Sequence, residues 1–136
     1  MSAARTSALA GLAYFTLVFG LGFVLGTVRR LWLVPRIGVT AAVMLELPVM
    51  LSASWLACGW TVRRFAVPPN PFARIVMGAA AFMLVMAGEL ALSVLVFGRT
   101  PAEHLAVLMR TDGLLGLGSQ LLFAAFPLLQ RGPRRG

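Results

Sequence analysis

Two glutamates stand inside long apolar stretches of the sequence, Glu46 in the second stretch and Glu89 in the third. A charged residue at the centre of a membrane-spanning helix costs about 2.5–3.5 kcal/mol on insertion scales, so such an acid faces protein or water and not lipid. Each acid must therefore be neutralised, hydrated or paired. A carboxyl group in this setting can exchange a proton or bind a cation, and it can also hold helices together through polar contacts.

The elements that must position these acids are four apolar stretches, at residues 7–28, 39–62, 72–97 and 113–129. Each is close to the roughly 20 residues that cross a bilayer core about 30 Å thick. Of the 136 residues, 60% are hydrophobic and 12% are charged, whereas soluble proteins contain about 25% charged residues. The sequence therefore predicts an all-α integral membrane protein, in which residues 1–136 form a single transmembrane domain built as a four-helix bundle.

Polar side chains recur at one depth in three of these stretches. Counting about 1.5 Å per helical residue from the face where the first stretch ends, Glu46 lies about 10 Å deep, Glu89 about 12 Å and Gln120 about 10 Å. Arg29 closes the first stretch at the same face, and its long side chain can reach inward. We therefore predict one intramembrane polar layer formed by Glu46, Glu89, Gln120 and Arg29.

Two interpretations of this polar layer stay open at the level of sequence. In the structural interpretation, Arg29 or Arg30 pairs with a glutamate, Gln120 completes the network, and the layer decides which helices pack together. In the functional interpretation, the glutamates line a pathway or pocket and exchange a proton or a cation. Pro48 lies two residues after Glu46 and has no amide proton, so it predicts a helix kink that opens space beside the acid.

A short fifth helix is predicted at residues 101–110, between the third and fourth stretches. Thr100 is suited to the N-cap, Pro101 to the first helical position and Glu103 to the third, which is the pattern of a capping box. The segment is too short to cross a bilayer. We therefore expect it to lie in the membrane interface.

The basic residues indicate the partner that surrounds the protein. The net charge is +8, and all 12 basic residues are arginines spread among short loops. This distribution favours contact with anionic lipid headgroups over binding to nucleic acid. With both termini on the cytoplasmic side, that side holds seven arginines and the opposite side five: Arg5, Arg63, Arg64, Arg74, Arg131, Arg134 and Arg135, against Arg29, Arg30, Arg36, Arg99 and Arg110. The positive-inside rule therefore favours cytoplasmic termini.

Residues that typically bind metals or carry out covalent catalysis are scarce. His104 is the single histidine and Cys58 the single cysteine, so neither can be joined by a second residue of its kind in a zinc or haem site. The sequence shows no nucleophile elbow and no phosphate-binding loop. We therefore expect no metal and no cofactor, and an enzyme is the least favoured class.

The segment at residues 26–55 resembles small four-helix bacterial inner-membrane proteins of unassigned function. The resemblance rests on Arg29, Pro35-Arg36, Glu46-Leu47-Pro48 and Ser54-Trp55, and it covers roughly a quarter of the chain. It implies a membrane location and names no activity. We therefore expect a multi-pass protein of the bacterial inner (plasma) membrane.

Two functions are compatible with these features. The first is a small transporter or channel in which the intramembrane carboxylates handle protons or cations. Because a bundle of four helices is thin for a pathway, such a protein is expected to form a homo-oligomer or to join a larger complex. The second is a non-catalytic accessory or assembly subunit of a larger membrane complex, in which the polar layer serves helix packing. The sequence does not specify a substrate.

Overall fold

The computed structural model describes residues 2–130 and is 88% helical, with no strand in that range. Within this range, four helices are long enough and apolar enough to cross a membrane, and a shorter helix joins the last two of them. In chain order the elements are α1 (Ala3–Val28), the π-helix η1 (Arg29–Leu33), α2 (Val34–Ile37), α3 (Val39–Arg64), α4 (Pro71–Leu95), α5 (Pro101–Leu108) and α6 (Thr111–Leu129). The prediction of an all-α chain with four apolar helices is confirmed. The basic tail, with Arg131, Arg134 and Arg135, lies outside the described residues.

The first helix continues beyond the point where the sequence predicted its end. Helical structure runs from α1 through η1 and α2 as one segment of 35 residues, so the expectation that Arg29 closes the helix is wrong. The residues after Arg29 still include leucines and a tryptophan that suit a helix in lipid. The segment ends at Gly38, whose φ of 86° is a left-handed conformation that glycine adopts without strain. The Gly38 amide donates to the Val34 carbonyl (2.9 Å), and α3 begins at the next residue.

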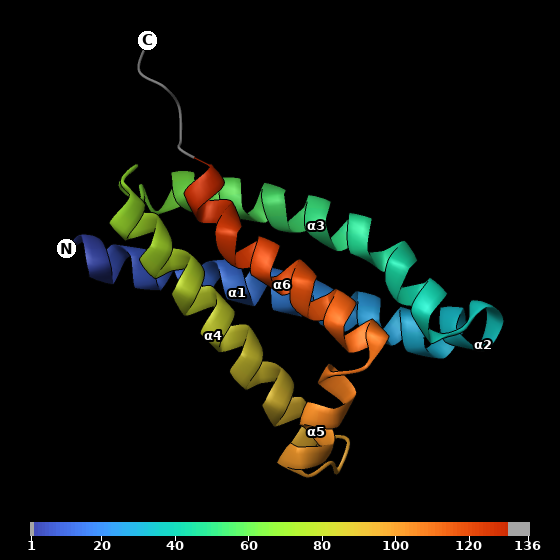
Figure 1. Cartoon of the computed structure of the whole chain (residues 1–136). Helices are drawn as coiled ribbons and strands as arrows, with labels where there is room; N and C mark the ends of the chain where they lie inside the picture. The colour runs from blue at the N-terminus through green and yellow to red at the C-terminus, as the bar shows by residue number, and fades with distance from the viewer. Residues whose placement is uncertain (1, 131–136) are drawn as a thin grey trace.

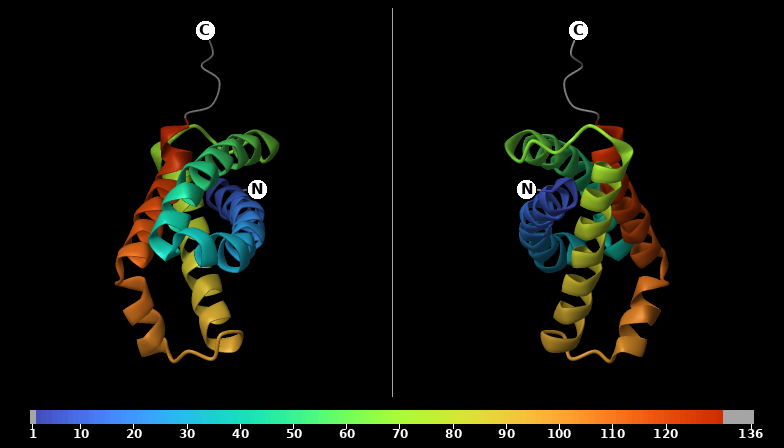
Figure 2. Two further views of the ribbon diagram at one scale, coloured as in Figure 1. Left: turned by 90° about the vertical axis from the view of Figure 1, so that its right-hand side faces the viewer. Right: turned by 90° about the vertical axis from the view of Figure 1, so that its left-hand side faces the viewer.

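The contacts among the long helices form a closed ring. Helix α1 packs against α3 and α4, and α6 packs against the same two helices. Figure 1 shows α1 and α3 side by side over much of their length, while α4 crosses α1. The C-terminal end of α4 leads away from this contact with α5 attached, as both views in Figure 2 show. The helices are therefore close together at one end of the molecule and diverge at the other.

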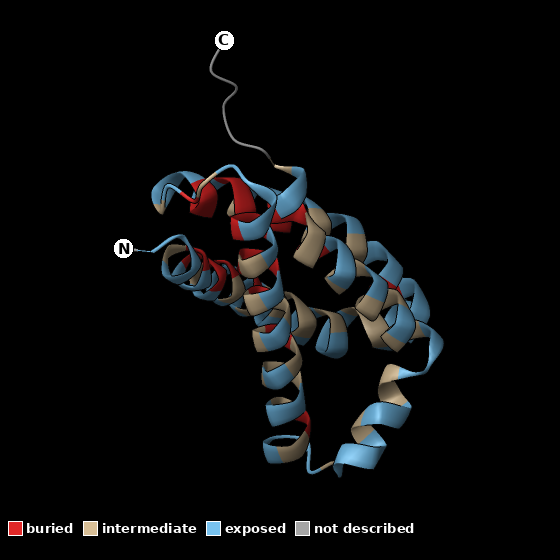
Figure 3. Ribbon diagram, turned by 60° about the vertical axis from the view of Figure 1, so that its left-hand side comes forward, coloured by how far each residue is buried: buried red, intermediate tan, exposed pale blue. Residues whose placement is uncertain are grey.

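The tightly packed end contains most of the buried side chains, as Figure 3 shows. The core cluster takes its residues from the first half of α1, the second half of α3, much of α4 and the end of α6. Two glycines bring backbones into contact there. A Cβ on Gly11 would lie 2.7 Å from the Met77 carbonyl oxygen, and one on Gly78 would lie 2.1 Å from the Ala124 carbonyl oxygen. Any side chain at either position would push α1 or α6 away from α4.

A tyrosine satisfies a backbone carbonyl that a proline leaves free. In an α-helix the amide of residue 127 would donate to the carbonyl of Phe123, but Pro127 has no amide proton. The hydroxyl of Tyr14 on α1 donates to that carbonyl at 2.8 Å. The Tyr14 and Phe123 rings also stack, with centroids 4.1 Å apart. The Tyr14 side chain is fully buried, so this contact joins α1 to α6 where no competing solvent reaches it.

A buried arginine holds the end of α6 against the start of α4. Arg74 lies in the first turn of α4 and is only 3% exposed. Its guanidinium donates to the carbonyl of Pro127 (2.9 Å) in the last turn of α6 and to the carbonyl of Pro68 (3.2 Å) in the linker that precedes α4. The last carbonyls of a helix lack intrahelical partners, so a cation there satisfies both hydrogen bonding and the helix dipole.

The short helix α5 begins as the sequence predicted. The Glu103 amide donates to the Thr100 hydroxyl (3.1 Å) and the Thr100 amide donates to the Glu103 carboxylate (3.4 Å), which together form the expected capping box. The helix ends at Leu108, earlier than predicted, and α6 begins at Thr111. The location of α5 relative to a membrane surface stays a prediction.

Candidate functional site

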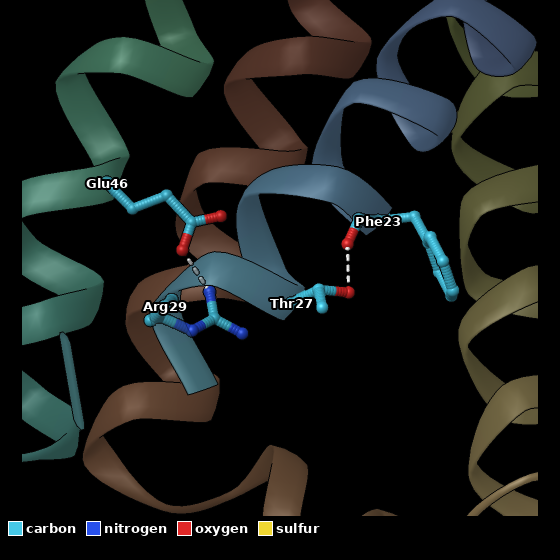
Figure 4. A network of polar contacts seen from close by, with 4 residues as sticks. All are labelled: Phe23, Thr27, Arg29 and Glu46. Carbon is cyan, nitrogen blue, oxygen red and sulfur yellow. Dashed lines mark hydrogen bonds and ion pairs between the residues drawn. The ribbon is translucent and has the colours of Figure 1, made fainter. Parts of the chain in front are cut away.

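The first component of the predicted polar layer is an ion pair between Arg29 and Glu46. Arg29 is the first residue of η1, and Glu46 lies two turns into α3. The Arg29 guanidinium donates to the Glu46 carboxylate, and Figure 4 shows the two side chains pointing toward each other between their helices. The Glu46 side chain is 11% exposed and that of Arg29 is 30% exposed. The pair thus neutralises an acid that would otherwise be costly in an apolar setting.

The second component is a hydrogen bond between Glu89 on α4 and Gln120 on α6. The Gln120 side-chain amide donates to one Glu89 carboxylate oxygen. The Gln120 side-chain carbonyl oxygen is buried and has no hydrogen-bond partner within residues 2–130. Gly88 precedes the acid, and the Phe19 ring of α1 lies 3.0 Å from the place of its missing Cβ. Glu89 is therefore half-buried beside the contact of α4 with α1, with the neutral amide of Gln120 as its direct partner.

The two pairs bring together one polar residue from each long helical segment. Arg29 comes from the continued first helix, Glu46 from α3, Glu89 from α4 and Gln120 from α6. The four predicted residues therefore form two hydrogen-bonded pairs. The two acids differ in their direct partner, which is a cation for Glu46 and a neutral amide for Glu89.

These polar pairs lie away from the tightly packed core. Arg29 is at the far end of α1, Glu46 is near the start of α3, and Glu89 is near the end of α4. In Figures 1 and 2 the C-terminal part of α4 leads away from α1 and α3. Helix α3 continues through Pro48 beside Glu46, so the carbonyl four residues earlier lacks the usual amide donor. The kink expected there stays a prediction.

Two residues that hold helices together, Tyr14 and Arg74, are not predicted as structural contacts from the sequence. Tyr14 is not among the residues that the sequence singles out, and Arg74 contributes there only to the charge of one membrane side. For Tyr14 a signal existed, because Pro127 frees the Phe123 carbonyl and so calls for a donor from another helix. For Arg74 no comparable signal exists, since its two acceptors are backbone carbonyls that any sequence supplies.

Within residues 2–130, no three or more histidine, cysteine, aspartate or glutamate side chains group together in a manner suited to a metal ion. The four apolar helices are those of a multi-pass membrane protein. The chain matches no protein-family model, no curated protein and no solved structure.

Proposed function

We propose that this protein is a small membrane transporter or channel that moves protons or cations, with Glu89 as the group that exchanges them. The observation that carries the proposal is the contrast between the two intramembrane acids. Glu46 has a cation as its direct partner, whereas within residues 2–130 the Glu89 carboxylate is hydrogen-bonded only to the amide of Gln120. An acid whose charge is not directly neutralised is the one whose protonation or cation binding can change during use.

The partner of Glu89 can accommodate both of its protonation states. An ionised carboxylate only accepts hydrogen bonds, and the Gln120 amide group supplies a donor to it. A protonated carboxyl also donates, and the Gln120 carbonyl oxygen is a buried acceptor that no residue within 2–130 uses. Glutamine therefore offers a hydrogen bond to Glu89 before and after proton uptake. Glu46 is already engaged in an ion pair with Arg29, which makes it the less suited exchanger.

We further propose a membrane, an orientation and an oligomeric form for this protein. The four long helices form a transmembrane bundle in the bacterial inner membrane, with both termini in the cytoplasm and α5 in the opposite interface. Because four helices leave little room for a pathway, the working form is a homo-oligomer. The diverging end of the molecule supports this, since it leaves Glu89 near a region that a second copy or a rearrangement can enclose.

The experiment is a flux measurement on the purified chain in proteoliposomes with an imposed pH gradient and an internal pH-sensitive dye. Glu89→Gln keeps the size and hydrogen bonding of the side chain but removes the titratable group, so we expect a folded protein without pH-dependent flux. Glu103→Gln is the matched control, because this exposed residue keeps its capping-box acceptor and should leave flux unchanged. Full flux through Glu89→Gln would exclude Glu89 as the exchanging group.

A second candidate function is a non-catalytic assembly subunit, and the Arg29–Glu46 ion pair favours it. An ion pair between two helices is a means of fixing which helices associate. If this is its main role, reversing the pair with Arg29→Glu and Glu46→Arg should restore the folded yield that either single change lowers. Absence of flux from the wild type, together with co-purification of a stoichiometric larger partner, would establish the subunit over the transporter.

A further inference from the structure

Two arginines from separate segments converge on a single phenylalanine ring. The guanidinium carbon of Arg30, in η1, lies 4.3 Å from the ring centre of Phe97, and that of Arg99 lies 5.2 Å from the same centre. Arg99 is held in place by a backbone hydrogen bond from its amide to the Ser93 carbonyl (2.9 Å) and by a side-chain contact to the buried Ser93 hydroxyl (3.4 Å). Two like charges are thus gathered over one half-exposed aromatic ring.

Neither of these arginines has a carboxylate partner within residues 2–130. The ion pairs in that range are Arg29 with Glu46 and Arg110 with Asp112. Glu103, the acid nearest to Arg99 in sequence, is engaged with the Thr100 amide in the capping box. The ring of Phe97 attracts each cation but does not neutralise it. The pair therefore presents two uncompensated positive charges to whatever lies beside the ring.

We propose that Arg30 and Arg99 bind the phosphate of an anionic phospholipid, with Phe97 placing them at the membrane surface. Guanidinium groups contact phosphate oxygens through paired hydrogen bonds, and two of them can enclose one phosphate. A lipid is favoured over a free anion because Leu95 and Val96, just before Phe97, are 81% and 65% exposed. They offer apolar contact to an acyl chain below the headgroup. The site does not depend on whether the protein transports anything.

The test is native mass spectrometry of the purified full chain titrated with phosphatidylglycerol in detergent. Each arginine near an anionic surface contributes about 1 kcal/mol, which corresponds to about fivefold in affinity. We therefore expect Arg30→Gln and Arg99→Gln each to weaken binding of one lipid about fivefold, and the double variant to lose that lipid. The lysine variants at both positions keep the charge without the planar fork and should weaken binding less.

Arg36→Gln is the matched control. Arg36 also stacks on an aromatic ring, that of Trp32 at 4.6 Å, but no second arginine within residues 2–130 joins it there. Circular dichroism of each variant checks that helical content is preserved, and the lysine variants still decide the question if a glutamine variant does not fold. The proposal is overturned if Arg36→Gln weakens lipid binding as much as Arg30→Gln does. It is equally overturned if inorganic phosphate displaces the lipid at matching concentration, which would make the site one for a soluble anion.

Discussion

Removal of the Tyr14 hydroxyl gives the sharpest test of the packing between α1 and α6. The Tyr14→Phe variant keeps the ring that stacks on Phe123 at 4.1 Å and removes only the donor to the Phe123 carbonyl. That carbonyl loses its remaining donor, because Pro127 supplies no amide proton. The free energy of unfolding should fall as a result.

The size of the loss follows from the burial of this contact. Leaving a buried acceptor unsatisfied costs about 1–3 kcal/mol, while interhelical hydrogen bonds in membrane proteins contribute up to about 1.7 kcal/mol. Tyr14 is fully buried and the bond is 2.8 Å long, so we expect a loss of about 1–2 kcal/mol. Pro127→Ala restores an amide to the helix, so in that background Tyr14→Phe should cost less than about 0.5 kcal/mol.

The assay is a double-mutant cycle measured by equilibrium unfolding in mixed detergent micelles. Thr16→Val is the control, because its hydroxyl bonds to the Leu12 carbonyl within its own helix on an exposed face, and its loss should change stability little. The expected result is contradicted if Tyr14→Phe lowers the free energy of unfolding by the same amount with proline and with alanine at position 127. Equal costs would mean that the hydroxyl does not compensate for the proline.

Two further predictions concern the packed end of the molecule and use the same unfolding assay. Arg74→Gln should lower the free energy of unfolding by about 2–3 kcal/mol, because charged hydrogen bonds to two carbonyls are lost. The control is Arg64→Gln at an exposed position, which should stay within about 0.5 kcal/mol of wild type. Equal losses in the two variants would contradict the role of Arg74. Gly78→Ala should destabilise by about 1–3 kcal/mol, since its Cβ would lie 2.1 Å from the Ala124 oxygen. The Cβ of Gly116→Ala would meet no atom of residues 2–130 within 4 Å, so a loss of stability at Gly116 as large as at Gly78 would disprove the close approach.

The helical class could be predicted from sequence because hydropathy alone reports it. Apolar stretches of about 20 residues leave few alternatives to spanning helices, and the capping box at Thr100 and Glu103 is a purely local signal. The end of the first helix lies beyond the predicted position, because two consecutive arginines in the sequence, Arg29 and Arg30, resemble a membrane boundary. Their side chains instead turn toward Glu46 and toward Phe97, respectively, while the backbone continues as a helix.

The sequence predicts which residues belong to the candidate site, but not which of them contact each other. Because the rise per residue of a helix is constant, counting residues along each helix predicts a similar membrane depth for four of them, Glu46, Glu89, Gln120 and Arg29. Which acid contacts the arginine depends on helix rotation and neighbour relations, and the sequence of one helix does not specify either. The contacts around Phe97 were not anticipated, since they join residues from η1 and from the turn after α4.

The positions of the two polar pairs along the chain also determine the order in which the paired residues are synthesised. Synthesis proceeds from the N-terminus, and Arg29 precedes Glu46 by 17 residues, so the first acid emerges after its partner. Glu89 precedes Gln120 by 31 residues and must emerge before its partner exists. The helical hairpin of α1 and α3 can therefore leave the insertion machinery with its acid already matched. The helix that contains Glu89 is made without the partner of its carboxyl group, which arrives only with the last helix.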